Sequence, residues 1–252
     1  MTGLGFSVGD CAGGLSTVSP IRLAVPDAAP ERWAAGPFVA ALGGAVTHGG
    51  RQVAAYPALL AARVGMAVAN FGCRHAGPDA FLGDPGLCAA VARAEVCVIE
   101  AGGVRNLSNP FYRVHPRRND RLLVVEPALK RLYPEVDFTE IAFTGHLMRV
   151  LRSGGQGRFA PVRNTLRAQW QDRMRRMLSR WRCPTVLWWP PGADEGDDLE
   201  PDPALVEPLR PLLAETVIVD PGAPAGTSSG APAIAKALAD PVVRLVPRRR
   251  RV

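Results

Sequence analysis

The sequence predicts an α/β fold built on a five-stranded parallel sheet. Three features indicate it: short apolar runs of strand length, helical segments between successive runs, and glycine or proline at the end of most runs. Strands that alternate with helices favour a parallel sheet covered on both faces, because a right-handed crossover is the usual return to a parallel neighbour. The chain has 252 residues, of which 47% are apolar and 21% charged, so it is long enough to bury one such core.

The first half of the chain supplies three of the expected strands, at 38–42, 66–71 and 96–99. Helices are expected between them at 56–64, 79–82 and 86–94. The first of these helices has Pro57 in its first turn, where proline is well tolerated. The spacing of strand, helix and strand is that of a βαβ unit, which places the first two strands side by side and parallel.

The second half begins with a stretch that hydrophobic periodicity predicts to be helical, 122–181. Its clearest helix, 158–181, carries an apolar stripe at three- and four-residue steps and arginines on its other face. The last two strands are expected at 185–189 and 216–219, and the last two helices at 203–214 and 231–239. From these elements we predict three parts of the chain: a lead-in segment 1–36 with a strand-like piece at 21–25, a single α/β domain 37–240 and a basic tail 241–252.

A polar loop follows the third strand after Gly102 and Gly103, and we place the candidate site there. Ligands of parallel sheets bind beyond the carboxyl ends of the strands, and a simple connection does not need so many hydrogen-bond donors. The donors are Arg105, Asn106, Ser108, Asn109, Arg113, His115, Arg117, Arg118 and Asn119.

The net charge of +7 and the pI near 9.7 could indicate an anionic partner, but they come almost entirely from arginine. Compositional bias explains the excess better than nucleic-acid binding, because no nucleic-acid motif accompanies it. We interpret the arginines of the helix 158–181 as a solvated helix face, in preference to a binding surface for RNA or lipid headgroups. The four arginines that end the chain are treated in the same way.

The five cysteines are scattered and form no pair with metal-ligand spacing, so we expect free thiols in a reducing compartment. No metal and no cofactor is predicted. The N-terminus has no basic segment leading into an apolar one, and no window approaches the length of a membrane span. The sequence therefore predicts a cytoplasmic protein with no membrane partner, and it leaves the oligomeric state open.

Several segments resemble an uncharacterised bacterial domain-of-unknown-function family that is distantly similar to the SGNH (GDSL-type) hydrolases. The resemblance covers position 39 to the end of the helix 158–181, and its most specific motifs are HPRRND and EVDFTE. The other segments are LGGAVTHGG, YPALL, NFGCRHAGPDAFLGDP and FTGHL. The similarity to SGNH enzymes implies a three-layer, flavodoxin-like fold with strand order 2-1-3-4-5 and with 122–181 as a helical insertion. It also implies a serine nucleophile after the first strand, a glycine and an asparagine in the oxyanion hole, and a C-terminal Asp-x-x-His.

Carried over by position, the nucleophile falls on Ala45, which cannot attack a carbonyl. The nearest hydroxyl is Thr47, beside His48, so these two residues and the oxyanion-hole candidate Asn106 are the candidate catalytic set. The oxyanion-hole glycines fall on Gly72 or Gly77 and on Gly103. No histidine follows His146, so the base of a Ser-His-Asp triad is missing as well. His146 is expected to be packed or capping, and His75 to be a loop residue.

Three interpretations stay open from these residues. The chain is an SGNH-like esterase with a rearranged catalytic set, or a non-catalytic module that binds an O-acylated or anionic, glycan-type ligand, or a protein whose arginine-rich loop pairs structurally with Glu135, Asp137 or Glu140. For the binding module, we expect Asn106, Arg117 and Arg118 to converge on one anion site next to Gly44 and Gly103. The complete set of candidate binding residues is Gly44, Gly72, Gly103, Ser108, His115, Arg117, Arg118 and Asn119.

Overall fold

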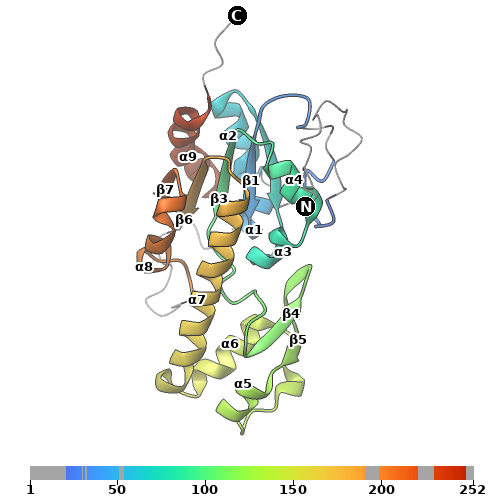
Figure 1. Ribbon diagram of the computed structural model, residues 1–252, viewed down its shortest axis with the longest axis vertical. Helices are drawn as coiled ribbons and strands as arrows, with labels where there is room; N and C mark the ends of the chain where they lie inside the picture. Colours follow the sequence, from blue (N-terminus) through green and yellow to red (C-terminus); the bar gives the residue numbers. More distant parts are fainter. Residues whose placement is uncertain are drawn as a thin grey trace, which may run out of the picture.

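The computed structural model describes residues 21–29, 31, 33–50, 54–190, 199–220 and 230–247. Its main sheet has five parallel strands in the order β2-β1-β3-β6-β7, which confirms the predicted sheet and its order (Figure 1). The strands are β1 (Phe38–Gly43), β2 (Ala67–Gly72), β3 (Val96–Glu100), β6 (Thr185–Trp189) and β7 (Glu215–Ile218).

Helices cover both faces of this sheet and give three layers (Figure 1). The side chains of successive β1 residues point alternately into two hydrophobic cores, one on each face of the sheet. Val39 and Ala41 pack toward α2 (Tyr56–Val64) and α9 (Ala231–Leu245). Ala40 and Leu42 pack on the opposite face. The helices of the opposite side are α3 (Pro78–Leu82), α4 (Pro85–Val91) and α7 (Gln156–Arg180). Burial on both faces explains why the strands are apolar throughout rather than alternating.

The boundaries of the first helices follow local chemistry. Helix α2 has proline in its first turn and ends at Gly65, whose φ of 66° is left-handed and therefore suits glycine. Helix α4 begins after Asp84, whose carboxylate accepts from the Leu87 N–H. A short helix that the sequence did not predict, α1 (Ala45–His48), directly follows β1.

The region between β3 and α7 corrects the prediction that 122–181 is helical. It opens with an antiparallel hairpin of β4 (Tyr112–His115) and β5 (Arg118–Val125), and the second strand includes 122–125. The four adjacent apolar residues there fit a helix or a strand equally well, so periodicity alone could not decide. The remaining elements are helical: α5 (Pro127–Leu132), η3 (Phe138–Glu140), α6 (Thr144–Ser153) and α7.

The predicted lead-in segment is more firmly packed than expected. Residues 21–25 form no strand, but the backbone N–H groups of Arg22 and Leu23 donate to the Asp84 carboxylate. Trp33 is 3% exposed and its ring packs against Phe38 and Phe71. Leu23, Val25 and Trp33 therefore belong to the core, while positions 1–20, which include one cysteine, lie outside the described residues.

Two predicted features near the C-terminus also change. The predicted helix 203–214 is a short α8 (Pro203–Val206) followed by a 3-10 helix η4 (Glu207–Leu212), because prolines at 208 and 211 remove α-helical donors. Helix α9 runs to Leu245, so the predicted boundary between domain and tail at 240 falls inside a helix. The four-arginine run from 248 on and most of the acidic loop 194–202 lie outside the described residues.

Within the described ranges no helix combines the length and the apolar character needed to cross a bilayer. The cysteines at 73, 88, 97 and 183 are free thiols, as predicted.

Candidate functional site

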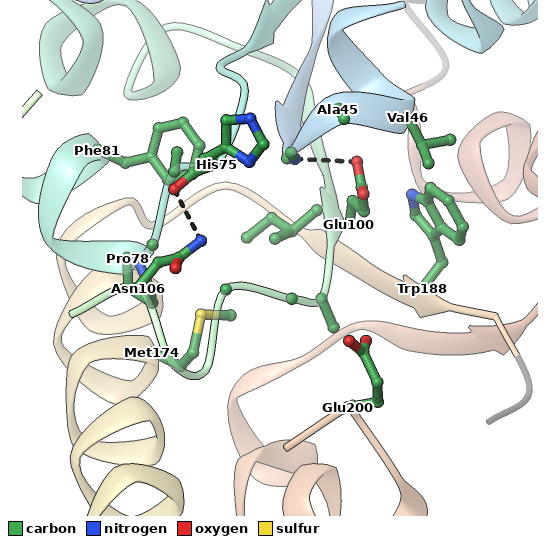
Figure 2. Close-up of a pocket in the computed structure, with 18 of the residues that line it drawn as sticks. Ala45, Val46, His75, Pro78, Phe81, Glu100, Asn106, Met174, Trp188 and Glu200 are labelled. Atoms are coloured by element: carbon green, nitrogen blue, oxygen red, sulfur yellow. Dashed lines mark hydrogen bonds between the residues drawn. The ribbon is translucent and has the colours of Figure 1, made fainter. Parts of the chain in front are cut away.

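A cavity of about 270 Å³ lies beyond the carboxyl ends of β1 and β3. From β1 the chain turns outward to the edge strand β2, whereas from β3 it continues on the other side to β6, so the cavity is at the switch point of the sheet. Its walls come from the turns at 43–46, 75–78 and 99–106, from Met174 and Met177 of α7, and from Trp188 of β6 (Figure 2). Segments far apart in the sequence thus meet at one point.

Glu100, the last residue of β3, is the central polar group of this cavity (Figure 2). Its Oε2 accepts from the Gly44 N–H at 3.0 Å, the Thr47 N–H at 2.9 Å and the Thr47 hydroxyl at 2.5 Å. The carboxylate therefore caps the first turn of α1 from a neighbouring strand, at a place where Gly44 supplies no side-chain cap. A side chain at Gly43 would meet both the Thr47 hydroxyl and Glu100, so glycine is required there.

Burial raises the pKa of the Glu100 carboxyl above its ordinary value of 4.5. The three hydrogen bonds from Thr47 and Gly44 act in the opposite direction, since they favour the charged form. The nearby carboxylate of Glu200, which also lines the cavity, adds to the increase in pKa. A carboxyl group with a raised pKa in a cavity can exchange a proton with a ligand nearer neutral pH than an exposed glutamate can.

A buried chain of hydroxyls supports Glu100 from behind. Thr47 is fully buried, and its Oγ1 lies 3.4 Å from the Tyr56 hydroxyl, which in turn accepts from the Trp188 indole N–H at 3.4 Å. Burial raises the pKa of Tyr56, so this phenol stays protonated. The Thr47 hydroxyl therefore acts as a fixed donor to Glu100.

Thr47 and His48, the candidate nucleophile and its neighbouring base, both lie in helix α1. Thr47 points to Glu100, whereas the His48 Nδ1 lies 3.0 Å from the Gly72 carbonyl oxygen. Neither is among the residues that line the cavity. The structure does not bring these two side chains together as nucleophile and base.

The oxyanion-hole candidates Gly72, Gly77 and Asn106, and the anion-site candidate Gly44, are bonded within the protein. The Gly44 N–H donates to Glu100, the Gly72 N–H to Asn70 Oδ1 at 2.9 Å, and the Gly77 N–H to Asn119 Oδ1 at 2.8 Å. The Asn106 amide donates to the His75 carbonyl at 3.0 Å and accepts from Thr144. Gly44, Gly103 and Asn106 do line the cavity, as the prediction of a shared site requires.

His75, expected to be an ordinary loop residue, lies on the wall of this cavity (Figure 2). Its φ of 60° makes it the one non-glycine residue of the described chain with a left-handed backbone. The neighbouring Gly77 packs directly on the backbone oxygen of Asn106, and Gly103 on that of Ala76, so the two loops fix each other. An unusual backbone conformation held by close packing is typical of functional loops.

The hairpin residues of the predicted site lie elsewhere. His115 Nδ1 accepts from the backbone N–H groups of Arg117 and Arg118, each at 3.2 Å, and so closes the hairpin turn. Both arginine side chains are exposed, and Arg117 borders a separate groove between the hairpin and α3. Within the described structure the cavity wall includes neither arginine, so the expected convergence of Asn106, Arg117 and Arg118 does not occur.

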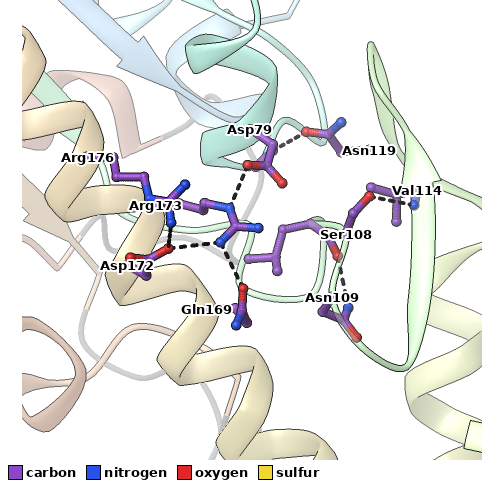
Figure 3. A network of polar contacts seen from close by, with 11 residues as sticks. Asp79, Ser108, Asn109, Val114, Asn119, Gln169, Asp172, Arg173 and Arg176 are labelled. Carbon is purple, nitrogen blue, oxygen red and sulfur yellow. Dashed lines mark hydrogen bonds and ion pairs between the residues drawn. The ribbon is translucent and has the colours of Figure 1, made fainter. Parts of the chain in front are cut away.

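Two of the three carboxylates that the structural interpretation assigned to these arginines have other partners. Glu135 pairs with Arg158, and Asp137 caps the 3-10 helix at Thr139. The remaining hairpin candidates are structural: Asn119 is 1% exposed and bonds Gly77, and Ser108 accepts from the Val114 N–H. Beside them, Arg173 of α7 pairs with Asp79 of α3 (Figure 3).

The residues that sequence reasoning missed are Glu100, His75, Glu200, Met174, Met177 and Trp188. One signal was visible: a single carboxylate ends the otherwise apolar run of β3. Arg105 lies 3.8 Å from Glu200 on the cavity wall. In the described ranges no group of three or more His, Cys, Asp or Glu side chains is arranged to hold a metal ion.

The family model described as "Domain of unknown function (DUF6473)" matches residues 24–249 of this chain. The chain belongs to this family. A comparison with curated proteins finds no match. The DUF6473 region includes the whole parallel sheet, the hairpin and the cavity, so the site described above is part of the DUF6473 domain.

Proposed function

We propose that the cavity between the ends of β1 and β3 is the functional site of an SGNH-like protein, which binds a small, partly apolar ligand and uses no serine nucleophile. The observation that carries the proposal is the Glu100 carboxylate. This carboxylate, at the end of β3, is hydrogen-bonded to Gly44 and Thr47 in the turn after β1. An SGNH enzyme has its nucleophile in that turn. The five-stranded order of the sheet and the position at its switch point support the same scaffold.

The composition of the wall argues against hydrolysis through an acyl-enzyme. Ala45 has no nucleophilic atom, and none of the described residues that line the cavity is a serine, threonine or cysteine. The N–H groups of Gly44, Gly77 and the Asn106 amide already donate to protein acceptors. Such a site retains the shape of a hydrolase pocket and binds without acylation.

The ligand predicted from the resemblance was O-acylated or anionic and of glycan type. The apolar side of the cavity, with Met174, Met177 and Phe81, suits an acyl chain. Glu100 and Glu200 disfavour an anionic group there, because like charges in a partly buried site repel. Of the two predicted ligand types, we therefore favour the acylated one.

A second candidate is an enzyme in which Glu100 and His75 exchange protons with the ligand. Two observations favour it: burial raises the pKa of Glu100, and the exposed imidazole of His75 lines the same cavity. Turnover of acyl esters by the parent protein, lost in both Glu100→Gln and His75→Ala, would select this candidate.

The proposal can be tested by filling the cavity. Gly102 lines it and has open space where a side chain would start, so Gly102→Leu should block ligands without disturbing the backbone. Gly157 in α7 also has open space but lies outside the cavity wall, so Gly157→Leu is the matched control. A panel of acylated sugars should raise the melting temperature of the parent and of Gly157→Leu, but not of Gly102→Leu.

A fluorophosphonate probe tests the absence of a serine nucleophile in the same samples. We expect no labelling of the parent protein, whereas stoichiometric labelling of any serine would contradict the proposal. Equal ligand-induced stabilisation of Gly102→Leu and the parent would show that the ligand binds elsewhere.

A further inference from the structure

The charges that face the cavity are unbalanced. Its wall carries two carboxylates, Glu100 and Glu200, and one guanidinium, Arg105. Arg105 lies 3.8 Å from Glu200, on the more exposed side of the cavity, where the side chains of both are more than a third exposed. Glu100, at the buried end, has no cation beside it in the described part of the wall. The formal charge of the described wall is therefore negative, and the excess is at the buried end.

One oxygen of Glu100 is available to a ligand. The hydrogen bonds from Gly44 and Thr47 all go to Oε2. Oε1 lies on the side of Gly44 where a side chain would project, and no donor of the described chain bonds to it. The hydroxyl chain behind Glu100 fixes the carboxylate, so Oε1 is a positioned acceptor on the cavity wall.

Three hydrogen-bond donors at the cavity are already used within the protein. The N–H groups that approach the cavity at Gly44 and Gly77 and the amide of Asn106 are each bonded to a protein acceptor. A ligand anion at these three groups would have to displace one of these bonds, whereas a ligand donor would complete the hydrogen bonding of Glu100. Burial of a carboxylate is unfavourable unless it is paired, so a bound cation would stabilise it.

Much of the rest of the wall is apolar. Its apolar side chains include Met174, Met177, Trp188, Ile234 and Phe81. The cavity of about 270 Å³ accommodates a short hydrocarbon body next to a single polar head group.

We infer that the cavity binds a small molecule in which an amino group, as ammonium, is attached to a short alkyl or acyl body, and that the ammonium lies against Oε1 of Glu100. The inference rests on the proposed function of the same cavity and names its ligand class. The hydrocarbon body contacts Met174 and Met177, and the ammonium donates to the carboxylate.

The test compares three probes of one chain length, hexylamine, hexanol and hexanoate, by titration calorimetry on the full chain at neutral pH. Charge-assisted hydrogen bonds are about twice as strong as neutral ones, so hexylamine should bind about tenfold more tightly than hexanol. Hexanoate should bind more weakly than either. Glu100→Gln should abolish the preference for the amine, so that hexylamine and hexanol bind with similar affinity.

Glu207→Gln is the matched control, because it removes one carboxylate from an exposed pair with Arg210 outside the cavity wall. It should leave all three affinities unchanged. Tightest binding of hexanoate, or an amine preference that persists in Glu100→Gln, would overturn the inference.

The same probes separate this inference from the proposed function. If hexanol and hexylamine bind equally, and both are lost in Gly102→Leu, then the cavity binds ligands but the ammonium assignment is wrong. If Gly102→Leu binds the probes like the parent, or if no probe binds the parent, both the cavity and its ligand class are refuted.

Discussion

The hairpin of β4 and β5 and the cavity at the end of β3 are two polar regions of opposite construction. The hairpin has its polar residues close together in the sequence, yet they close its own turn, bond buried backbone groups or face solvent. The cavity is lined by residues from several segments that are far apart in the sequence. A dense run of donors therefore indicated a well-hydrogen-bonded loop, whereas one carboxylate at the end of an apolar strand marked the candidate site.

The largest effect is expected where the two loops of the cavity touch. A side chain at Gly77 would collide with the backbone oxygen of Asn106, while Gly102, in the same cavity wall, has open space. Gly77→Ala should therefore lower stability by about 2–3 kcal/mol, and Gly102→Ala should change it little. Urea unfolding of the two variants measures this difference, and equal stabilities would contradict the close packing of the loops.

Within the hairpin, the buried amide of Asn119 should matter more than the exposed arginines. It accepts from the Gly77 N–H and donates to the His115 carbonyl, so Asn119→Ala leaves two polar backbone groups without this partner. We expect a loss of about 1–3 kcal/mol in unfolding free energy. A loss as small as that of an exposed-site variant would show that the hairpin is not tied to the cavity loops in this way.

The pH dependence of stability should report Glu100. Its folded-state pKa is raised by burial, so the folded state holds the proton more tightly than the unfolded state does. The contribution to stability is then complete below the ordinary value of 4.5 and is lost as the pH rises through the raised pKa. Thermal unfolding across this range should show a decline in the parent that is absent in Glu100→Gln. A parallel decline in both proteins would assign it to another group.

The smallest effect is expected at the tip of the hairpin. Arg117 and Arg118 are exposed and the cavity wall includes neither, so the double variant Arg117→Ala, Arg118→Ala should change unfolding free energy by no more than about 0.5 kcal/mol. The rise in melting temperature caused by a ligand of the cavity should be the same in this double variant as in the parent. Loss of that stabilisation would restore these arginines to the binding site.

The sheet could be predicted from the sequence because its strands are buried on both faces, and short apolar runs ending in glycine are hard to mistake. The hairpin could not, since the apolar run 122–125 and the turn at Pro116 fit several local structures, and the pairing of β4 with β5 depends on contacts made after folding. The short helix α1 is stabilised by a carboxylate from another strand, which no local pattern reveals.

The predicted site and the cavity lie at the same edge of the sheet, and Gly44, Gly103 and Asn106 line the cavity. Its chemistry was not predicted. Glu100 is far from Thr47 in sequence and acquires its raised pKa only through burial in the folded chain. His75 looked like a loop residue because nothing local shows its left-handed backbone or its place on the wall of the same cavity as Glu100.

A crystallographic fragment soak tests the central claim, that the cavity and not the hairpin is the binding site. Fragments with amine, alcohol and carboxylate heads would be soaked into one crystal form of the full chain. We expect electron density for the fragments between Gly44, Glu100 and Trp188, with the amine fragments nearest the carboxylate. Density for carboxylate fragments against Arg117 and Arg118, with the cavity empty, would contradict it.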